Sequence, residues 1–265
     1  MLKKFILFLC LAGLVYAYRF TKEERPFTGG EQSFTGEERP LLGNGQKEQI
    51  IEHEGFTVSY NPEYRIANWV AYELTPEEAQ SDSVARWNKF APDPDVVGPT
   101  ATNDDYRNSG YDRGHLAPAG DMKWSAKAMR ESFYFSNICP QNKGLNGGMW
   151  HKLEKQCRTW AGQHGTLSIV TGPVIGGELE RLGKNRVGIP ELFYKVIGCT
   201  PRGDTPKGIG FLFENRNYKN TSLRVMAVTV DSVEAVTGID FFPSLPREIQ
   251  DRMESAVDPA FWILR

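Results

Sequence analysis

Cysteine is scarce in this chain: its 265 residues include four, and one of them, Cys10, lies in an N-terminal apolar run. The other three, Cys139, Cys157 and Cys199, are an odd number, so at most one pair can form, and the sequence does not choose it. A disulfide-dense framework is therefore excluded. A structural zinc site built from Cys139, His151 and Cys157 is disfavoured, because the spacing matches no common zinc pattern and no fourth ligand is evident.

Long apolar runs and a strong net charge are also lacking. The apolar run at residues 5–15 has eleven residues, which is too short to span a membrane comfortably as a permanent anchor. The chain carries 31 Lys and Arg residues against 33 Asp and Glu residues, a net charge of −2 at pH 7. Residues 86–158 nevertheless hold 11 basic against 8 acidic side chains, so this segment has a local excess of positive charge.

The first 17 residues have the pattern of a secretory signal peptide. Lys3 and Lys4 precede the apolar run, and Val15-Tyr16-Ala17 resembles a small-residue cleavage site. A mitochondrial transit peptide would contain more Arg and Ser. We therefore expect cleavage after Ala17, a secreted or periplasmic protein, and no stable membrane span after cleavage. An uncleaved anchor is the alternative.

Residues 18–50 differ in composition from the rest of the chain. The segment 23–29 recurs imperfectly at 34–40, and Gly, Pro, Glu and Thr outnumber large apolar residues. Such a segment cannot bury a core, which predicts a flexible linker, with a propeptide or a partner-binding tail as the alternative. Residues 51–265 are long enough to form one domain with a proper core.

Short apolar runs bounded by Gly, Pro and Asn predict buried strands in this domain. The expected strands are residues 56–60, 66–74, 133–135, 167–171, 192–197, 209–213 and 225–230. Helical patterns interrupt them without a regular strand-helix-strand rhythm. The sequence therefore predicts an α+β fold rather than a doubly wound sheet.

Residues 105–158 contain side chains that suit phosphodiester chemistry. His115 is the candidate general base, because an unperturbed imidazole titrates near neutral pH. Arg113 lies two residues earlier, so it points to the same side if this segment is a strand, and its guanidinium suits bidentate phosphate contact. Asn146 offers an amide oxygen to a hard ion such as Mg²⁺, which keeps most of its waters.

Asn146 also begins a helical pattern, as its expected N-cap. An apolar stripe recurs at helical spacing, formed by Met149, Leu153, Cys157 and Trp160. The neighbouring stripe contains Asn146, Trp150, Glu154 and Arg158. Because Asn146 and Glu154 are separated by roughly 12 Å of helix rise, both cannot easily touch one ion, and we expect Glu154 to contact a metal-bound water instead.

Three motifs in this region resemble a known family. In order they are Asp112-Arg113-Gly114-His115, Ser136-Asn137-Ile138-x-Pro140-Gln141 and Leu145-Asn146-x-Gly148-x-Trp150-x-x-Leu153-Glu154. Further fragments are Asn68-Trp69-Val70-Ala71-Tyr72, Asp105-Tyr106-Arg107-x-Ser109-Gly110, Thr171-Gly172-Pro173 and Phe193-Tyr194-Lys195-Val196. Their order and spacing, over roughly residues 55–242, resemble the DNA/RNA non-specific endonucleases, the group of Serratia nuclease and mitochondrial endonuclease G.

The resemblance implies a mixed antiparallel sheet with a ββα-metal (His-Me finger) active site, and it implies roles by position. His115 matches the general base, Asn146 the single direct protein ligand of Mg²⁺, and Glu154 the ligand that acts through water. Arg113 and Arg158 match arginines that contact phosphate or stabilise the transition state, Arg86 is the best candidate for a further upstream arginine, and Asn137 matches an asparagine that supports the site. Family members cleave DNA and RNA with little base preference and leave 5′-phosphate ends.

Three functional hypotheses from different classes remain open. The first is a Mg²⁺-dependent nuclease acting on DNA and RNA, with Mn²⁺ as a possible substitute. The second is a phosphodiesterase that uses the same site on another substrate. The third is a non-catalytic module that binds nucleic acid or a partner. A mildly acidic chain with a basic segment at 86–158 fits transient contact with phosphate backbones, although an ordinary mixed surface explains the charge alone. Whether the protein is a monomer or a homodimer also stays open.

Overall fold

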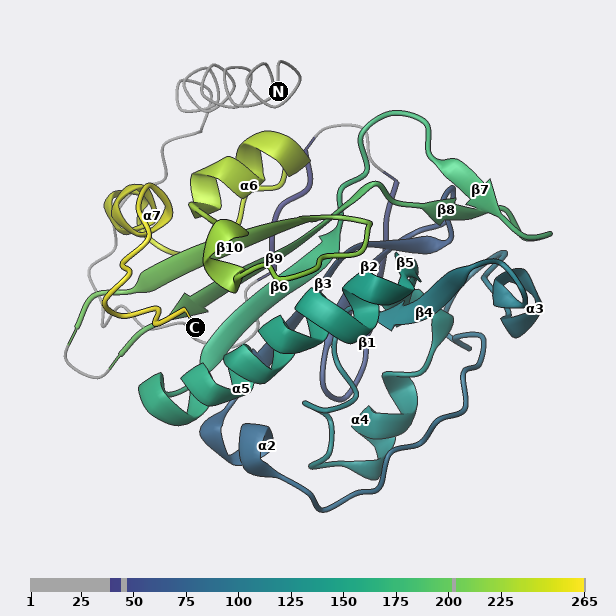
Figure 1. The fold of residues 1–265 in the computed structure, drawn as a ribbon, viewed down its shortest axis with the longest axis horizontal. Helices are drawn as coiled ribbons and strands as arrows, with labels where there is room; N and C mark the ends of the chain where they lie inside the picture. The colour runs from purple at the N-terminus through teal and green to yellow at the C-terminus, as the bar shows by residue number, and fades with distance from the viewer. Residues whose placement is uncertain (1–38, 44–46, 202–203, 265) are drawn as a thin grey trace.

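The computed structural model of the protein describes residues 39–43, 47–201 and 204–264. Its centre is a seven-stranded sheet in the order β1-β2-β3-β6-β9-β10-β11 (Figure 1). The strands are β1 Gln49–Glu52, β2 Thr57–Asn61, β3 Ile66–Leu74, β6 Leu167–Pro173, β9 Leu192–Cys199, β10 Lys207–Glu214 and β11 Ala227–Val228. Every neighbouring pair in this sheet is antiparallel, which confirms the predicted α+β fold.

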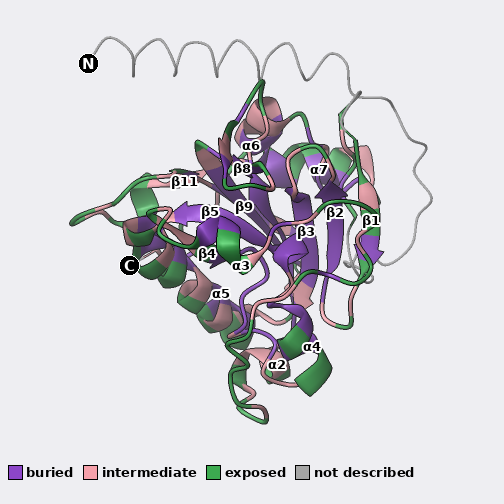
Figure 2. Ribbon diagram, turned by 90° about the vertical axis from the view of Figure 1, so that its right-hand side faces the viewer, coloured by how far each residue is buried: buried purple, intermediate pink, exposed green. Residues whose placement is uncertain are grey.

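Helices cover both faces of the sheet (Figures 1 and 2). The helices in the described residues are α2 Pro76–Gln80, α3 Asn103–Tyr106, α4 Ala126–Glu131, α5 His151–His164, α6 Val230–Thr237 and α7 Arg247–Glu254. Three short helical segments are η1 Phe135–Asn137, η2 Leu145–Trp150 and η3 Leu223–Val225. Helix α5 lies on one face, and α6 and α7 lie on the other. Thr229 caps the start of α6, and Gly238, at φ 70°, ends it.

Strand β9 shows how the two faces form from one strand. Phe193 and Ile197 pack into the core beneath α5, whereas Tyr194 and Val196 pack into the core beneath α6 and α7. This follows from the two-residue alternation of a strand that is buried on both sides. The predicted apolar stripe of α5 enters the first of these cores, and its four members are at most 5% exposed.

A ββα unit lies beside the main sheet and leads into α5 (Figure 1). Strands β4 Tyr111–His115 and β5 Ile138–Asn142 pair antiparallel, and η2 and α5 follow. The expected strand at 133–135 is wrong: residues 135–137 form a 3₁₀ turn, and the strand begins at Ile138. The side chain of Asn137 stabilises this turn through its bond to the Ser132 carbonyl, so the chain bends before it becomes extended. A second small ribbon pairs β7 Glu180–Leu182 with β8 Val187–Ile189.

The N-terminal boundary of the domain lies earlier than predicted. The predicted signal peptide at 1–17 and most of the predicted linker at 18–50 lie outside the described residues. Within that linker, however, Leu41 pairs with Asp240, and β1 begins at Gln49. The sequence Gln-Ile-Ile-Glu is too short and too polar to stand out as a strand, and β1 is ordered by its pairing with β2. None of the helices in the described part of the chain is long and apolar enough to cross a membrane.

Candidate active site

A cavity of about 760 Å³ lies where the ββα unit meets the loops that precede it. Six of the seven predicted site residues line it: Arg86, Arg113, His115, Asn146, Glu154 and Arg158. Helix α3 and the residue that follows it contribute Asn103, Tyr106 and Arg107. The structure therefore brings together side chains that lie up to 72 positions apart, from Arg86 to Arg158.

His115 is nearly buried at the end of β4. Its ring packs against Phe133 and Phe90 at centroid distances of 4.7 and 5.4 Å, and only 8% of the residue is exposed. Burial, together with the positive charges of Arg86 and Arg113, lowers the pKa of His115 to about 3. The imidazole is therefore neutral at physiological pH. Its Nε2 atom is buried and makes no hydrogen bond within the described part of the chain. A neutral imidazole has one ring nitrogen that is able to accept a proton.

The depressed pKa of His115 predicts a specific acid sensitivity of the fold. The unfolded histidine titrates at 6.5 and the folded one at about 3, so the unfolded state binds more protons between these values. The free energy of unfolding should then fall by about 1.4 kcal/mol for each pH unit below 6.5. His115→Phe should lack this decrease. Asp121 contributes the opposite slope below pH 6 in both proteins, and it cancels in their difference. Urea unfolding between pH 4 and 7 measures the difference, and parallel curves would refute the prediction.

Arg113 and Arg86 place positive charge beside His115. The guanidinium carbon of Arg113 lies 4.3 Å from the centre of the Phe90 ring, and its Nη1 donates to Oδ1 of Asn103. Arg86 lies over the ring of Phe133 at 5.1 Å. Since Phe90 and Phe133 are also the rings that contact His115, one aromatic cluster positions the base and both arginines.

Gly114, between Arg113 and His115, has a steric reason to be glycine. A Cβ atom at this position would lie 2.2 Å from Oε1 and 2.8 Å from Cβ of Gln141, which is fully buried on β5. We expect Gly114→Ala to destabilise the fold by about 1–3 kcal/mol through overpacking. Thermal unfolding should show a fall of about 2–4 °C per kcal/mol. Gly147→Ala is the matched control, because nothing lies within 4 Å of a Cβ there. Equal melting temperatures for both variants would refute this explanation.

Asn146 lies in η2 and not at the N-cap of α5, which corrects the prediction. Residues 145–150 form a π-helical segment with a kink at Gly148, where φ and ψ are both −108°. Two consecutive glycines permit this backbone, and π-turns occur often at functional sites. The side-chain Nδ2 of Asn146 donates to Oδ2 of Asp112 at 3.0 Å. This bond fixes the orientation of the amide and leaves its oxygen available as a ligand.

Glu154 lies in the first turn of α5 and lines the same cavity. Its side chain is 13% exposed, and one carboxylate oxygen is 3.3 Å from Nδ1 of His151. His151 is exposed and also lines the cavity. The carboxylate therefore lies on the side of the cavity formed by α5, on the same helix as Arg158.

Arg158 belongs to a network that the sequence did not predict. Its Nη1 donates to Oδ1 of Asp121 at 2.5 Å, and the hydroxyl of Tyr72 donates to Oδ2 of the same carboxylate at 3.1 Å. Asp121 is fully buried, and burial raises its pKa to about 6, although the charge of Arg158 opposes that shift. Asp121 thus holds Arg158 at the edge of the cavity. Tyr72 ends the Asn68 to Tyr72 fragment of the family resemblance, whereas no local pattern marks Asp121.

Asn137, the seventh predicted residue, does not line the cavity. It is completely buried, and its side chain accepts from the backbone N–H of Ala117 and donates to the carbonyls of Ala117 and Ser132 at 2.8–2.9 Å. These bonds fix the segment that follows His115. The position of Asn137 therefore agrees with the supporting role that the resemblance implied and not with direct participation in catalysis.

A second buried cluster supports the turn next to Asn137. Nε2 of His53 lies 3.0 Å from Oδ2 of Asp93, and the hydroxyl of Ser136 donates to the same oxygen at 2.5 Å. Hydrogen bonds lower the pKa of Asp93 despite its burial. The carboxylate thereby ties the start of the domain to the turn that precedes β5. Because these three residues are far apart in sequence, only the fold reveals the cluster.

The donor set in the cavity fits a hard divalent cation. An amide oxygen at Asn146 and a carboxylate at Glu154 are oxygen donors, which suit Mg²⁺ better than a soft metal. Cys139, Cys157 and Cys199 are free, buried and absent from the cavity lining, so they do not add sulfur ligands.

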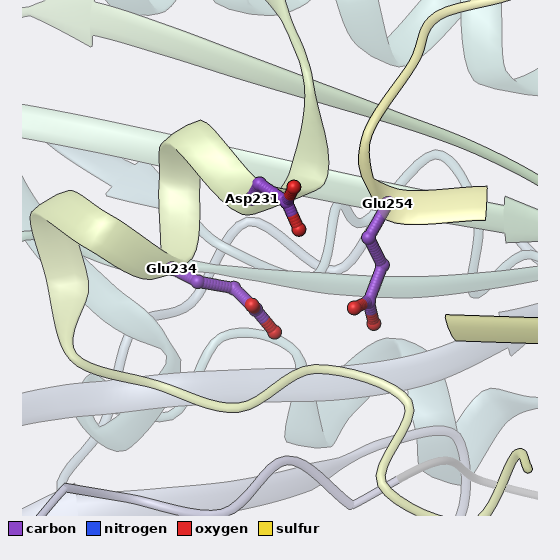
Figure 3. A group of neighbouring side chains, drawn as sticks. All are labelled: Asp231, Glu234 and Glu254. Atoms are coloured by element: carbon purple, nitrogen blue, oxygen red, sulfur yellow. The ribbon is translucent and has the colours of Figure 1, made fainter. Parts of the chain in front are cut away.

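A separate acidic cluster, Asp231, Glu234 and Glu254, lies on α6 and α7, on the other face of the sheet (Figure 3). It does not line the cavity, and Glu234 accepts from the backbone N–H of Phe241.

The antiparallel sheet, the ββα unit and a cavity with a neutral histidine and several arginines define a fold of the ββα class. A family model described as DNA/RNA non-specific endonuclease matches residues 38–248. The chain belongs to this family, as the motifs around His115 and Asn146 predicted.

Individual relatives agree with this assignment. The chain is 35% identical over 226 residues to mitochondrial nuclease EXOG of Xenopus laevis, over 79% of this chain and 61% of that protein. It is 34% identical over 209 residues to human mitochondrial endonuclease G, over 74% of this chain and 70% of that protein. A chain from the crystal structure of the EndoG/EndoGI complex superimposes with a TM-score of 0.71 at 30% identity, covering 76% of this chain and 89% of the other.

The relatives contradict the predicted secreted or periplasmic location. Xenopus EXOG and human endonuclease G are both mitochondrial nucleases, and they match along most of the chain. Two lysines before a short apolar run are too general a feature to specify a compartment. The low Arg and Ser content of the N-terminus is likewise insufficient to exclude a mitochondrial location.

Proposed function

We propose that this protein is an endonuclease that hydrolyses phosphodiester bonds of both DNA and RNA, with Mg²⁺ as cofactor and Mn²⁺ as a substitute, and leaves 5′-phosphate ends. The observation that supports this most directly is that His115, Asn146, Glu154 and four arginines line one cavity. A base, an oxygen donor set for a divalent cation and phosphate-binding cations are the parts that hydrolysis of a phosphodiester needs.

His115 acts as the general base. The unprotonated ring nitrogen of the neutral imidazole accepts a proton from the attacking water, and the P–O3′ bond breaks as the new P–O bond forms. The neighbouring charges of Arg86 and Arg113 keep the imidazole unprotonated before the reaction. Because the ring is wedged between Phe90 and Phe133, its direction is fixed before substrate arrives.

The arginines neutralise the phosphate. Arg113 and Arg86 bind its non-bridging oxygens on the side of His115, and Arg158, held by Asp121, binds on the side of α5. Asn146 is the direct protein ligand of Mg²⁺, and Glu154 holds a metal-bound water. When bound, the cation supplies further positive charge for the transition state and for the leaving oxygen.

Asp112 should control how well Asn146 binds the cation. Asp112→Ala removes the acceptor that orients the Asn146 amide, so we expect apparent Mg²⁺ affinity to fall about 10- to 100-fold, the usual effect of losing a residue that orients a ligand. Titration of activity against Mg²⁺ measures the shift, and Mn²⁺ binding followed by electron paramagnetic resonance measures it without turnover. Asp82→Ala is the control, since Asp82 pairs with Lys123 on the surface and neither residue lines the cavity. Equal affinities for the two variants would exclude this role.

The direct test uses the purified chain with plasmid DNA, linear DNA and RNA, in Mg²⁺ or in excess EDTA. We expect metal-dependent cleavage of all three substrates, including internal cleavage of the circular plasmid. Products should accept end-labelling by polynucleotide kinase only after phosphatase treatment, as 5′-phosphate ends require. Intact polymers with folded, metal-supplied protein would refute the proposed function. Cleavage of short dinucleotide esters alone would point to a phosphodiesterase instead.

A further inference from the structure

Lys195 is a charged residue at a position where the strand requires an apolar one. It lies in the middle of β9, between Phe193 and Ile197 on the face beneath α5, and it is completely buried. Burial lowers the pKa of its ammonium group. A buried lysine is rare unless it is paired, and departures from a consistent local pattern concentrate at functional sites.

The surroundings of this ammonium are the inner side of the active site. Nζ lies 5.0 Å from the ring centre of Trp150 and 5.7 Å from that of Tyr72. The charges of Glu154 and Asp121 both favour its protonated form, and so does the Cys157 thiol. Lys195 in turn lowers the pKa of Asp121, as Arg158 does. The Tyr72 side chain thus contacts both the ammonium of Lys195 and the carboxylate of Asp121, which pairs with Arg158.

Lys195 also contacts the backbone that follows the general base. Its Nζ donates to the carbonyl of Leu116 at 3.5 Å, and the Trp150 ring that it faces donates through Nε1 to the carbonyl of His115 at 3.1 Å. A single side chain therefore reaches both halves of the site: the end of β4, which carries His115, and the start of α5, which carries Glu154 and Arg158.

We propose that Lys195 is a positioning residue for the cleavage reaction, because its buried ammonium faces Tyr72, which bonds the carboxylate that holds Arg158, and fixes the backbone next to His115. The proposal rests on the proposed function above. Lys195 touches no reacting atom, and it acts through Asp121, Arg158 and the carbonyl of Leu116.

The test compares Lys195→Met, Lys195→Arg and Lys207→Met in the full chain. Met matches the length of the lysine stem without its charge. Lys207 is the control, because it is an ion-paired lysine of the neighbouring strand, bonded to Asp258, and does not line the cavity. We expect Lys195→Met to lower kcat about 10- to 100-fold at unchanged KM, as the loss of an orienting residue does. Its melting temperature is measured alongside, because removing one partner of a buried charged group destabilises the fold, and kcat is compared at a temperature where all three variants are folded.

The pH dependence separates positioning from a merely structural role. Without Lys195 the pKa of Asp121 should rise further, because a positive charge that favours the ionised carboxylate is lost. The acid limb of the pH–rate profile should then move to higher pH in Lys195→Met, return toward the parent in Lys195→Arg, and stay unchanged in Lys207→Met. The effects of Lys195→Met and Asp121→Asn on kcat should not add, since both act on Arg158.

One readout does not depend on catalysis. Carboxyl-carbon NMR of Asp121, assigned by its loss in Asp121→Asn, reports the titration directly in the parent and in Lys195→Met. An unchanged Asp121 titration, or a parental kcat and pH profile in Lys195→Met, would overturn the positioning role while leaving the nuclease function intact. A parent protein that cleaves no nucleic acid would refute the function, and the NMR titration would still decide whether Lys195 controls Asp121.

Discussion

His115→Ala is expected to lower kcat for DNA and RNA cleavage by about 10²- to 10⁴-fold, the usual contribution of a general base. The reason is that this neutral, nearly buried ring is the proposed proton acceptor, and alanine provides none. KM should change little, because the phosphate is bound by the arginines. Initial rates on plasmid and on RNA at saturating Mg²⁺ measure both constants.

His164→Ala is the matched control for that experiment. His164 also has a lowered pKa, but it stacks on Phe261 at the C-terminal end of α5 and does not line the cavity. The control should keep parental activity. A folded His115→Ala protein that cleaves as fast as the control would remove His115 from the mechanism.

Asn146→Ala is expected to abolish metal-dependent cleavage almost completely. Loss of the one direct protein ligand should weaken Mg²⁺ binding, and the several kcal/mol that a bound cation supplies to the transition state correspond to a loss of roughly two to four orders of magnitude in kcat/KM. Raising the Mg²⁺ concentration should recover part of the rate of Asn146→Ala, whereas it should not recover the rate of His115→Ala. Mn²⁺ binding by electron paramagnetic resonance checks the cause separately.

Asn146→Asp provides the comparison that isolates the ligand atom. Aspartate keeps an oxygen donor but places a second carboxylate near Oδ2 of Asp112, which now accepts from the Asn146 amide at 3.0 Å. We expect activity between that of the parent and that of Asn146→Ala. If alanine and asparagine support the same Mg²⁺ dependence at this position, Asn146 is not a ligand.

The sequence predicted those parts of the site that lie on regular local patterns. Arg113 and His115 share a side of β4 because a strand alternates, and Glu154 and Arg158 share a side of α5 because a helix repeats about every 3.6 residues. The apolar stripe that begins at Met149 correctly predicted which side of α5 is buried. Both inferences need only neighbouring residues.

The supporting residues were not predictable in this way. Asp121 lies in a loop, 37 positions before the arginine that it holds, and Lys195 lies 79 positions after the carbonyl that it contacts. Their partners are determined by how the strands order in the sheet, which single-residue propensities do not encode. In the sequence, Lys195 is distinguished as a charged residue inside an apolar run, within the Phe193 to Val196 fragment of the family resemblance. Neither feature identifies its partners.

The π-helical segment η2 makes the direction of the Asn146 amide independent of how α5 packs. In a regular α-helix the two would be coupled. A π-turn accommodates an extra residue, so removing one residue near Gly147 or Gly148 would restore α-helical winding and rotate whatever precedes it by about 100° around the axis. Helix α5, anchored by its apolar stripe, would keep its place while the amide of Asn146 turned away from Glu154. A single-residue insertion or deletion at Gly147-Gly148 should therefore remove or restore the metal ligand in one step, with no change to the apolar core.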